Sequence, residues 1–356
     1  MLPPQAVCDA FRRRSGFGPF VIAEIGVNHG GDLSTAIRLV EEAARGGADC
    51  VKFQTYKAET LASRHSPAYW DTSQEPTPSQ FALFQKHDRF NASDYIALAR
   101  HAAACGVSFA STPFDATAVE MLAPLVPFFK IASADITNEP LLTACARHGK
   151  PILLSTGASY VSEIEEAVRI MRGFLPAHQI GIMHCVLSYP TAYTDANLAM
   201  IEHLAACFPG HPIGYSDHTR PDPSMLVLLR SYLQGATIIE KHFTHDKSLP
   251  GNDHYHAMDI ADLGCLRAGV DLLHAVEGRP TKTVLPSEEP ARQHARRSIV
   301  VQRSLPAGHV LQAEDVAVKR PAGGLPPSAL AWIVGKRLTR DVDADDFLTV
   351  DHVTNR

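Results

Sequence analysis

The sequence predicts an α/β protein, a (β/α)8 TIM barrel followed by a small, mostly β domain. The main observation is a pattern that occurs eight times between residues 20 and 244: a short apolar run ends in polar or glycine residues, and a helical stretch follows. A second observation is the change of texture after residue 275, where proline and charged residues become frequent. Eight strand–helix units favour a closed barrel, and a doubly wound open sheet is the alternative.

The eight apolar runs are rich in Val, Ile, Phe and Leu and show little polar alternation. This composition is typical of parallel strands that are covered on both faces. In chain order the runs are FVIAEIGV, ADCVKFQT, VSFASTPF, FFKIAS, PILLSTG, IGIMHCV, PIGYSDH and TIIEKHFT, and they begin at Phe20, Ala48, Val107, Phe128, Pro151, Ile180, Pro212 and Thr237.

Amphipathic stretches separate the runs. In LSTAIRLVEEAARGGA, from Leu33, the apolar residues fall at helical spacing, and Gly46 and Gly47 suit a C-terminal stop. VSEIEEAVRIMRGFL, from Val161, has the same character. Both stretches predict helices that pack against the strands.

A long polar insertion, from Tyr56 to Phe90, follows the second run. Its portion PAYWDTSQEPTPSQF is rich in proline and serine and predicts a loop rather than a helix. A long loop on the active face of a barrel is often a lid. The alternative is a surface excursion with a short helix.

The change of texture divides the chain into a barrel domain (1–278), a linker (279–294) and a small domain (295–356). EGRPTKTVLPSEEPARQ is rich in proline and charge, which is typical of a linker. The residues after it form short β phrases separated by proline and glycine turns. So small a core is marginal alone, so we expect it to need a neighbour.

The composition excludes several classes of function. The formal net charge of −5 gives no support for nucleic-acid binding. The seven cysteines are scattered and never spaced as CxxC, which argues against a disulfide framework or a cysteine zinc site. No stretch is long and apolar enough for a membrane span or a signal core. We therefore expect a reduced, cytoplasmic protein.

Polar side chains gather where the predicted strands end, and in a barrel the chemistry lies at the carboxyl ends of the strands. A barrel interior built only for packing would not place so many polar groups there. These residues are Glu24, Lys52, Gln54, Thr112, Lys130, Ser133, Ser155, His218 and His242.

His218 and His242 close the seventh and eighth runs, so their imidazoles should converge at one rim. Such a pair can hold a divalent metal and leave coordination positions open for a substrate. The chain has 18 histidines, and position alone leaves a structural role for the pair equally open. Ser216, Asp217 and His218 resemble a hydrolase triad in letters only, because adjacent strand residues point to opposite faces.

Lys52 and Lys130 lie inside apolar strands, where a lysine is costly unless an anion meets it. The anion could be a substrate phosphate or carboxylate, or each lysine could form a buried pair with a carboxylate. Ser155 leads into a helix, a natural place for phosphate. Glu24 and Asp253 could act as a base, a metal ligand or a substrate acceptor, or could simply be turn or capping residues.

Several motifs occur in an order that carries a resemblance covering the chain from about residue 18 to its end. They are FVIAEIGVNHGG, VKFQTY, STPFD, FKIAS, LSTG, SYPT, IGYSDHT, IEKHFT and KRPAGG. Together they resemble the sialic acid (N-acetylneuraminate) synthase family, including its antifreeze-like (SAF, β-clip) C-terminal domain. The resemblance implies a (β/α)8 barrel with a SAF domain and a domain-swapped homodimer. The implied reaction condenses phosphoenolpyruvate (PEP) with an N-acylated mannosamine-type sugar, an N-acyl hexosamine, giving a nonulosonic acid and phosphate through C–O cleavage of PEP.

The resemblance also implies roles for individual residues. His218 and His242 would hold the metal, usually Mn²⁺, for which Mg²⁺ or Co²⁺ can substitute. Glu24 would lie near the reacting carbon, and Arg320 of the swapped domain would reach the sugar. The PEP-binding positions would be Lys52, Thr112, Lys130, Ser133, Ser155 and Ser216, and the sugar-side positions Gln54, Phe114, Asp135, Tyr189 and Asp253.

Three departures from the family pattern leave the sugar open. Leu187 stands where a polar residue is common, Asp135 replaces a glutamate, and Asn252 replaces a proline. Precursors of legionaminic or pseudaminic acids are therefore alternatives to N-acetylmannosamine or its 6-phosphate. Two other functions also remain: a Schiff-base aldolase or lyase with Lys130 as nucleophile, and a non-catalytic sugar-binding paralogue.

Overall fold

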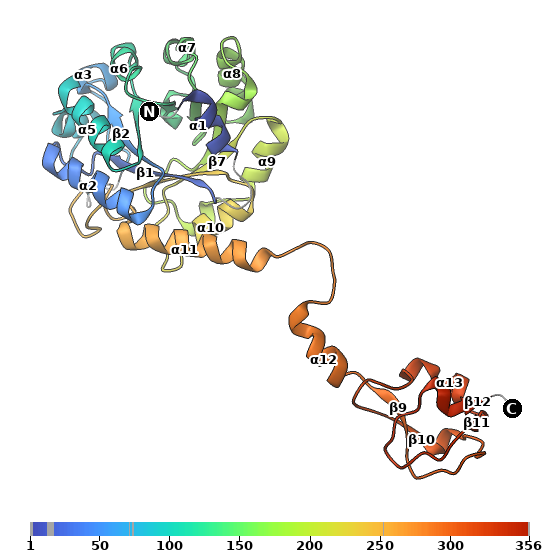
Figure 1. Ribbon diagram of the computed structural model, residues 1–356. Coiled ribbons are helices and arrows are strands. Elements are labelled where there is room, and N and C mark those ends of the chain that lie inside the picture. Colours follow the sequence, from blue (N-terminus) through green and yellow to red (C-terminus); the bar gives the residue numbers. More distant parts are fainter. Residues whose placement is uncertain (1–2, 13–17, 71, 73–74, 252, 355–356) are drawn as a thin grey trace. The chain divides into compact units, whose positions relative to one another are not determined.

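The computed structural model describes residues 3–12, 18–70, 72, 75–251 and 253–354. The chain divides into two compact units, Met1–Glu277 and Gly278–Arg356 (Figure 1). Each unit has its own hydrophobic core.

The first unit is a barrel of eight parallel strands within its described residues. Neighbours pair in the order β3-β2-β1-β8-β7-β6-β5-β4, and the two end strands, β3 and β4, also lie in contact. All eight predicted strands are confirmed, and nearly all of their residues are buried, which explains the lack of polar alternation. The strands are β1 (Phe20–Gly26), β2 (Cys50–Thr55), β3 (Ser108–Pro113), β4 (Phe129–Ile131), β5 (Ile152–Ser155), β6 (Ile180–Cys185), β7 (Ile213–Asp217) and β8 (Ile238–His242).

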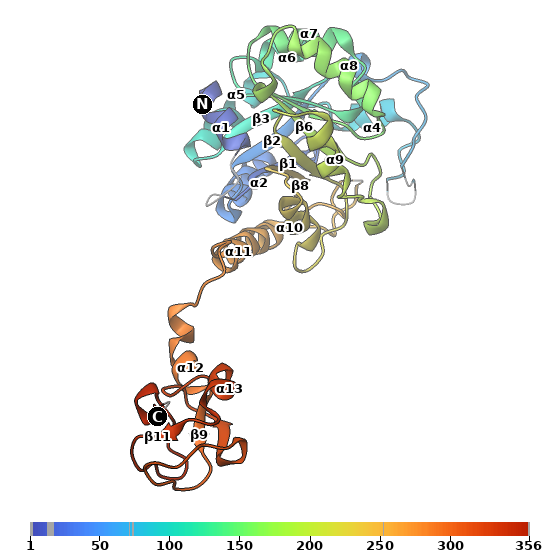
Figure 2. The same ribbon diagram turned by 90° about the vertical axis from the view of Figure 1, so that its right-hand side faces the viewer.

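Helices follow the strands and surround them (Figure 2). The predicted helix from Leu33 ends as expected, because Gly47 adopts a φ of +96° that few other residues tolerate. Asp32 caps its start by accepting a hydrogen bond from the Thr35 amide at 2.8 Å. The helices are α2 (Leu33–Gly46), α5 (Ala92–Ala104), α6 (Ala116–Leu122), α7 (Glu139–Arg147), α8 (Val161–Arg172), α9 (Met200–Cys207), α10 (Leu226–Leu233) and α11 (Ile260–Glu277).

An aromatic cluster closes the amino-terminal end of the barrel. Helix α1 (Pro4–Phe11) inserts Phe11, whose ring centroid lies 5.4 Å from that of Phe20 and 5.2 Å from that of Phe128. Phe20 begins β1 and Phe128 precedes β4, so the three rings pack where strands start. The largest group of polar strand-end residues lies at the opposite, carboxyl-terminal end, where a cavity opens.

The insertion between β2 and α5 contains two short helices, α3 (Ala58–Leu61) and α4 (Gln80–His87). This agrees with the alternative of an excursion with a short helix. Residues 71, 73 and 74 of the predicted loop lie outside the described residues. Glu75 fixes the insertion internally, because its buried carboxylate lies 3.0 Å from the Lys86 ammonium and its carbonyl accepts from the Trp70 indole at 2.9 Å.

The second unit is mostly β. Strands β9 (Ser298–Val301) and β10 (Val316–Lys319) form one antiparallel pair, and β11 (Arg337–Leu338) and β12 (Val353–Thr354) form another. Helix α13 (Leu330–Ile333) packs Ile333 into the core of this unit. The predicted linker contains a short helix, α12 (Glu289–His294). None of the described helices combines the length and apolar character that a membrane crossing requires.

Candidate active site

A cavity of about 720 Å³ opens at the carboxyl ends of the strands. Every residue that the sequence analysis assigned to catalysis, substrate or metal in the barrel lines it. These residues are Glu24, Lys52, Gln54, Thr112, Phe114, Lys130, Ser133, Asp135, Ser155, Tyr189, Ser216, His218, His242 and Asp253. Arg320 is exposed in the second unit, directly after β10, and is not among these lining residues.

The cavity floor carries two lysines and two glutamates, all buried. Lys52 contacts Glu24 and donates a hydrogen bond to Thr112 Oγ1 at 3.1 Å. The Lys130 ammonium lies 3.3 Å from the Glu240 carboxylate, which is also 4.0 Å from Lys52. In this structure each lysine therefore forms a buried pair with a carboxylate, which was one of the two alternatives. The sequence analysis did not identify Glu240 as the partner of Lys130.

The two glutamates differ in their affinity for a proton. Burial raises the pKa of Glu24 to about 7, against the opposing effect of Lys52, and the nearby Glu240 adds to the rise. Burial also works against ionisation of Glu240, but Lys130 and Lys52 lower its pKa overall. Two carboxylates whose environments push their pKa values apart can take different roles in acid–base chemistry.

The register of the barrel places the histidines next to these charges. Glu24 pairs across the sheet with His242 on one side and with Lys52 on the other. Side chains alternate along a strand, so Ser216 and His218 share one face of the chain, as do Glu240 and His242. The ring centroids of His218 and His242 are 5.5 Å apart.

Both histidines have a nitrogen available for a ligand. His218 Nδ1 lies 2.8 Å from the Val186 carbonyl, and in the neutral tautomer that donates this hydrogen bond the lone pair is on Nε2. His242 Nδ1 is buried, has no hydrogen-bond partner among the described residues, and lies 3.7 Å from Asp253 Oδ2. Burial, reinforced by His256 and His218, lowers the pKa of His242 well below its usual value, so the ring is neutral as metal binding requires.

Cys185 is a further neighbour of His218 that sequence reasoning did not assign to the site. Its Sγ lies 3.8 Å from His218 Nδ1. Burial lowers the proton affinity of His218, but Cys185 and the Val186 carbonyl offset this effect and raise its pKa. Cys185 thus favours the protonated form of His218, which directly follows β7.

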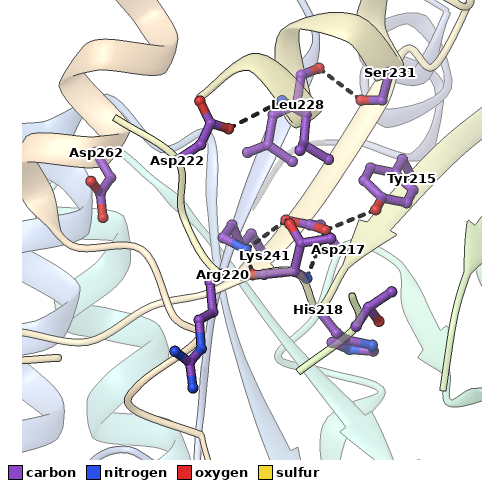
Figure 3. A network of polar contacts seen from close by, with 12 residues as sticks. Tyr215, Asp217, His218, Arg220, Asp222, Leu228, Ser231, Lys241 and Asp262 are labelled. Atoms are coloured by element: carbon purple, nitrogen blue, oxygen red, sulfur yellow. Dashed lines mark hydrogen bonds and ion pairs between the residues drawn. The ribbon is translucent and has the colours of Figure 1, made fainter. Parts of the chain in front are cut away.

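A buried polar network holds the backbone on which His218 sits (Figure 3). The Asp217 carboxylate accepts hydrogen bonds from Tyr215 Oη at 2.8 Å, from the Thr219 amide at 2.9 Å and from the Lys241 ammonium at 2.5 Å. Figure 3 shows Asp217 between Tyr215 and Lys241, with His218 directed away from them. Asp217 therefore orients the chain around His218 rather than its imidazole, and the hydrolase interpretation stays excluded.

Hydroxyl and amide groups surround the lysines. Ser133 Oγ accepts a hydrogen bond from the Gly157 amide at 2.9 Å, and Ser216 Oγ donates to Glu240 at 3.2 Å. Ser155 Oγ is buried and has no hydrogen-bond partner among the residues that the structure describes. Ser155 is thus poised to bind a ligand atom.

The mouth of the cavity is less buried and more varied. Gln54 donates to Glu24 at 3.1 Å, and Asp135 accepts from Asn138 at 3.0 Å. Burial raises the pKa of Asp135. The Tyr189 ring stacks at a tilt on His218, with centroids 4.3 Å apart. Phe114 and Leu187 complete this wall, and the insertion adds Tyr69, Trp70 and Phe84.

Glu240 and His256 are the main residues that sequence reasoning missed. Glu240 could have been found, since it stands two residues before His242 and so points to the same face of β8. His256 lies in a loop, where no periodicity indicates direction. The structure brings the ligand atoms of His242, Asp253 and His256 within 4.8 Å of one another.

Comparison with known proteins gives concordant matches. The NeuB family model matches residues 39–282 and the SAF domain model residues 296–354. The N,N'-diacetyllegionaminic acid synthase of Legionella pneumophila is 37% identical over 346 residues, covering 96% of each chain. The N-acetylneuraminate-9-phosphate synthase of Homo sapiens is 32% identical over 338 residues, 94% of this chain and 93% of its own. The crystal structure of N-acetylneuraminic acid synthetase from Leptospira borgpetersenii, in complex with citrate, aligns with a TM-score of 0.67 at 34% identity, covering 77% of this chain and 90% of its own.

Proposed function

Since this chain belongs to the NeuB family, whose named relatives are sialic and other nonulosonic acid synthases, we propose that it condenses PEP with an N-acylated mannosamine-type sugar. The products are a nonulosonic acid and phosphate. The observation that carries the proposal is the buried floor of Lys52, Lys130, Glu24 and Glu240. A small, highly charged anion with both a phosphate and a carboxylate matches two buried lysines.

PEP binds at this floor by exchanging partners with the glutamates. The ammonium groups of Lys52 and Lys130 turn from Glu24 and Glu240 to the carboxylate and phosphate of PEP. Charge-assisted hydrogen bonds of this kind are about twice as strong as neutral ones. Thr112, Ser133, Ser155 and Ser216 add donors, among which the buried Ser155 hydroxyl already lacks a hydrogen-bond partner in the described part of the chain.

The reaction then proceeds in two bond-forming stages. Carbon 3 of PEP attacks the aldehyde carbon of the open-chain sugar, and the aldehyde oxygen takes up a proton. Water adds to carbon 2 and loses a proton, and the tetrahedral intermediate expels phosphate by cleavage of the C–O bond. Glu24 takes the proton from water, because a group with a pKa of about 7 transfers protons efficiently near neutral pH.

His218 and His242 would hold a divalent cation, which we take to be Mn²⁺, with Mg²⁺ or Co²⁺ as substitutes. Bound there, the cation would supply Lewis-acid polarisation of the sugar aldehyde. The convergence of the two rings, 5.5 Å apart, and the buried Nδ1 of His242, which has no hydrogen-bond partner among the described residues, support this assignment. Gln54, Phe114, Asp135 and Tyr189 face the sugar, and Asp253 lies beside the cation site, with its Oδ2 3.7 Å from His242 Nδ1.

A panel of sugars supplied with PEP tests the function directly. We expect phosphate release and a product of the condensed mass with at least one N-acyl hexosamine, among them N-acetylmannosamine, its 6-phosphate and precursors of legionaminic or pseudaminic acids. Leu187 and Asp135 line the cavity, so we expect them to influence which sugar is accepted. Silence across the panel would favour the alternative of a non-catalytic sugar-binding protein.

Chelation separates the synthase from a Schiff-base aldolase. We expect EDTA to abolish activity and Mn²⁺ to restore it, because the proposed reaction needs a cation at His218 and His242 to polarise the aldehyde. A Schiff-base enzyme would survive EDTA and would be trapped on Lys130 by borohydride. Full activity in metal-free buffer would contradict the role given to the cation.

Arg320 completes the sugar site from a second copy of the chain. We propose a homodimer in which the SAF domain of one subunit covers the barrel of the other. The exposure of Arg320 in its own unit supports this arrangement.

A further inference from the structure

The loop after β8 folds back over the carboxyl end of that strand and is fastened there. The Met258 amide donates to the His242 carbonyl at 2.8 Å, and the Thr244 amide donates to the Met258 carbonyl at 2.9 Å. Asn28, which follows β1, also holds the loop. Its side-chain amide donates to the backbone carbonyls of Phe243 at 3.0 Å and Asp253 at 3.3 Å. The segment from Asp253 to Met258 is therefore held in register with His242.

This fastening brings two further side chains to His242. The ring centroid of His256 lies 4.9 Å from that of His242, and Asp253 Oδ2 lies 3.7 Å from His242 Nδ1. One ligand atom from each of the three residues lies within 4.8 Å of the others. Two metal–ligand bonds of about 2 Å each span about 4 Å, so small side-chain rotations close the set around one ion.

We propose that His256 is a metal ligand, and that His242, Asp253 and His256 form a three-ligand cation site. The inference deepens the proposed function and rests on its cation. His256 is 0% exposed, and the buried Nδ1 of His242 has no hydrogen-bond partner in the described part of the chain. Two imidazoles and a carboxylate suit Mn²⁺ and neighbouring divalent ions.

His218 lies beside this set but is not among the residues whose ligand atoms lie within 4.8 Å of one another, so it would join the ion only after a side-chain movement. Its ring centroid is 5.5 Å from that of His242 and 6.2 Å from that of His256. A site with only two histidines would bind a cation weakly and would need substrates to complete it. The set of His242, Asp253 and His256 binds the ion before PEP or sugar arrives, so cation affinity becomes a property of the free protein.

Titration of the metal-free chain with Mn²⁺, followed by electron paramagnetic resonance in the absence of PEP and sugar, measures that affinity. We expect His256→Gln to weaken binding by at least 10-fold, since loss of even an outer partner of a metal ligand costs about 10- to 100-fold. His203→Ala is the matched control: it removes an exposed histidine on α9 and should leave the affinity unchanged.

Pulsed paramagnetic resonance distinguishes a ligand from a residue that only positions His242. Direct ligation predicts that His256→Gln loses one imidazole nitrogen coupling to Mn²⁺, whereas a purely structural role would leave the number of couplings unchanged. The melting temperature gives an independent check, since an ion that binds the folded state raises it. We expect Mn²⁺ to raise the melting temperature of the native chain more than that of His256→Gln.

Unchanged affinity and unchanged nitrogen coupling in a folded His256→Gln chain would overturn the inference. Phosphate release from PEP by the native chain reports separately on the proposed function. If phosphate is released and His256→Gln still binds Mn²⁺ normally, only the inference fails. If no sugar yields phosphate while His256→Gln loses affinity and a nitrogen coupling, the proposed function fails and the metal site stands.

Discussion

Burial and charge move the pKa values of Glu24 and Glu240 in opposite directions. Both carboxylates lie at the cavity floor, but one has a raised and the other a lowered pKa. The difference depends on how strongly each interacts with the lysines. Removal of one lysine should therefore affect both the proposed PEP-binding floor and the difference between the pKa values of Glu24 and Glu240.

Lys52→Met tests whether the lysines of the cavity floor bind PEP. We expect kcat/KM for PEP to fall about 10- to 100-fold, because hydrogen bonds to charged groups contribute about 1.5–3 kcal/mol. Steady-state kinetics over a range of PEP concentrations measures the change. Lys57→Met, which removes an exposed lysine just beyond β2, should keep near-native kinetics. Equal losses in the two variants would argue against a special role for Lys52.

His29 makes the barrel sensitive to acid. Burial lowers its pKa to about 4, and its Nδ1 accepts a hydrogen bond from the Gly31 amide at 3.0 Å. An unfolded histidine has a pKa of about 6.5, so between these values only the unfolded chain holds the proton, and stability falls as the pH falls. From pH 7 to pH 5 we expect this group to reduce the free energy of unfolding by about 2 kcal/mol.

Urea unfolding of the barrel at pH 7 and pH 5 measures this loss. His29→Asn keeps an acceptor near Gly31 but does not titrate, so it should lose less stability between the two pH values than the native chain. The same loss in both chains would assign the acid sensitivity to other groups, such as His87 and His254, whose pKa values burial also lowers to about 4.

At the scale of elements, strands β7 and β8 are fixed to each other by the ion pair of Asp217 and Lys241. The pair is almost fully buried. Asp217 immediately precedes His218, and Lys241 immediately precedes His242. Because each partner neighbours a histidine in sequence, the pair joins the two strand ends that carry these histidines.

Asp217→Ala should lower the free energy of unfolding by about 3–5 kcal/mol, because it leaves the buried Lys241 charge uncompensated. Urea unfolding measures the loss. The double change Asp217→Leu with Lys241→Met should recover much of it, since an apolar pair carries no buried charge. Glu166→Ala, which breaks the exposed pair with Arg169 on α8, serves as control and should leave the unfolding midpoint near its native value. If the double variant is as unstable as the single one, charge burial is not the cause.

The long elements were predictable and the short ones were not. The eight strands are continuous apolar runs, and α2 and α8 have helical spacing, so local sequence determines them. Helices α3, α4 and α12 have only four to eight residues. Helices this short are marginal alone and form through tertiary contacts, such as the ion pair of Glu75 with Lys86, that a sequence does not display.

The residues of the candidate site were likewise predictable in part. Residues that end strands were predictable, because a barrel brings all strand ends to one face. Glu240 was overlooked inside the run TIIEKHFT, although its spacing of two residues from His242 predicts that it faces the cavity. The direction of His256 depends on hydrogen bonds between Met258 and the end of β8, which join residues of different segments and leave no periodic signal.

At the scale of the whole molecule, the proposed homodimer assigns Arg320 and His242 of one active site to different subunits. Mixing Arg320→Ala subunits with His242→Ala subunits should then restore activity, because half of the sites in a heterodimer contain both native residues. Phosphate release by purified heterodimers measures the recovery. No recovery in verified heterodimers would mean that each chain completes its own site.

The aromatic cluster of Phe11, Phe20 and Phe128 has a kinetic consequence. In the part of the chain that the structure describes, the large cavity opens at the opposite end of the barrel, so we expect reactants and products to pass through its mouth. The lysine floor is buried, whereas Gln54, Asp135 and Tyr189 nearer the mouth are only partly so. Whatever binds the floor must enter first and leave last, so a sugar analogue at the mouth should trap PEP beneath it and inhibit uncompetitively toward PEP.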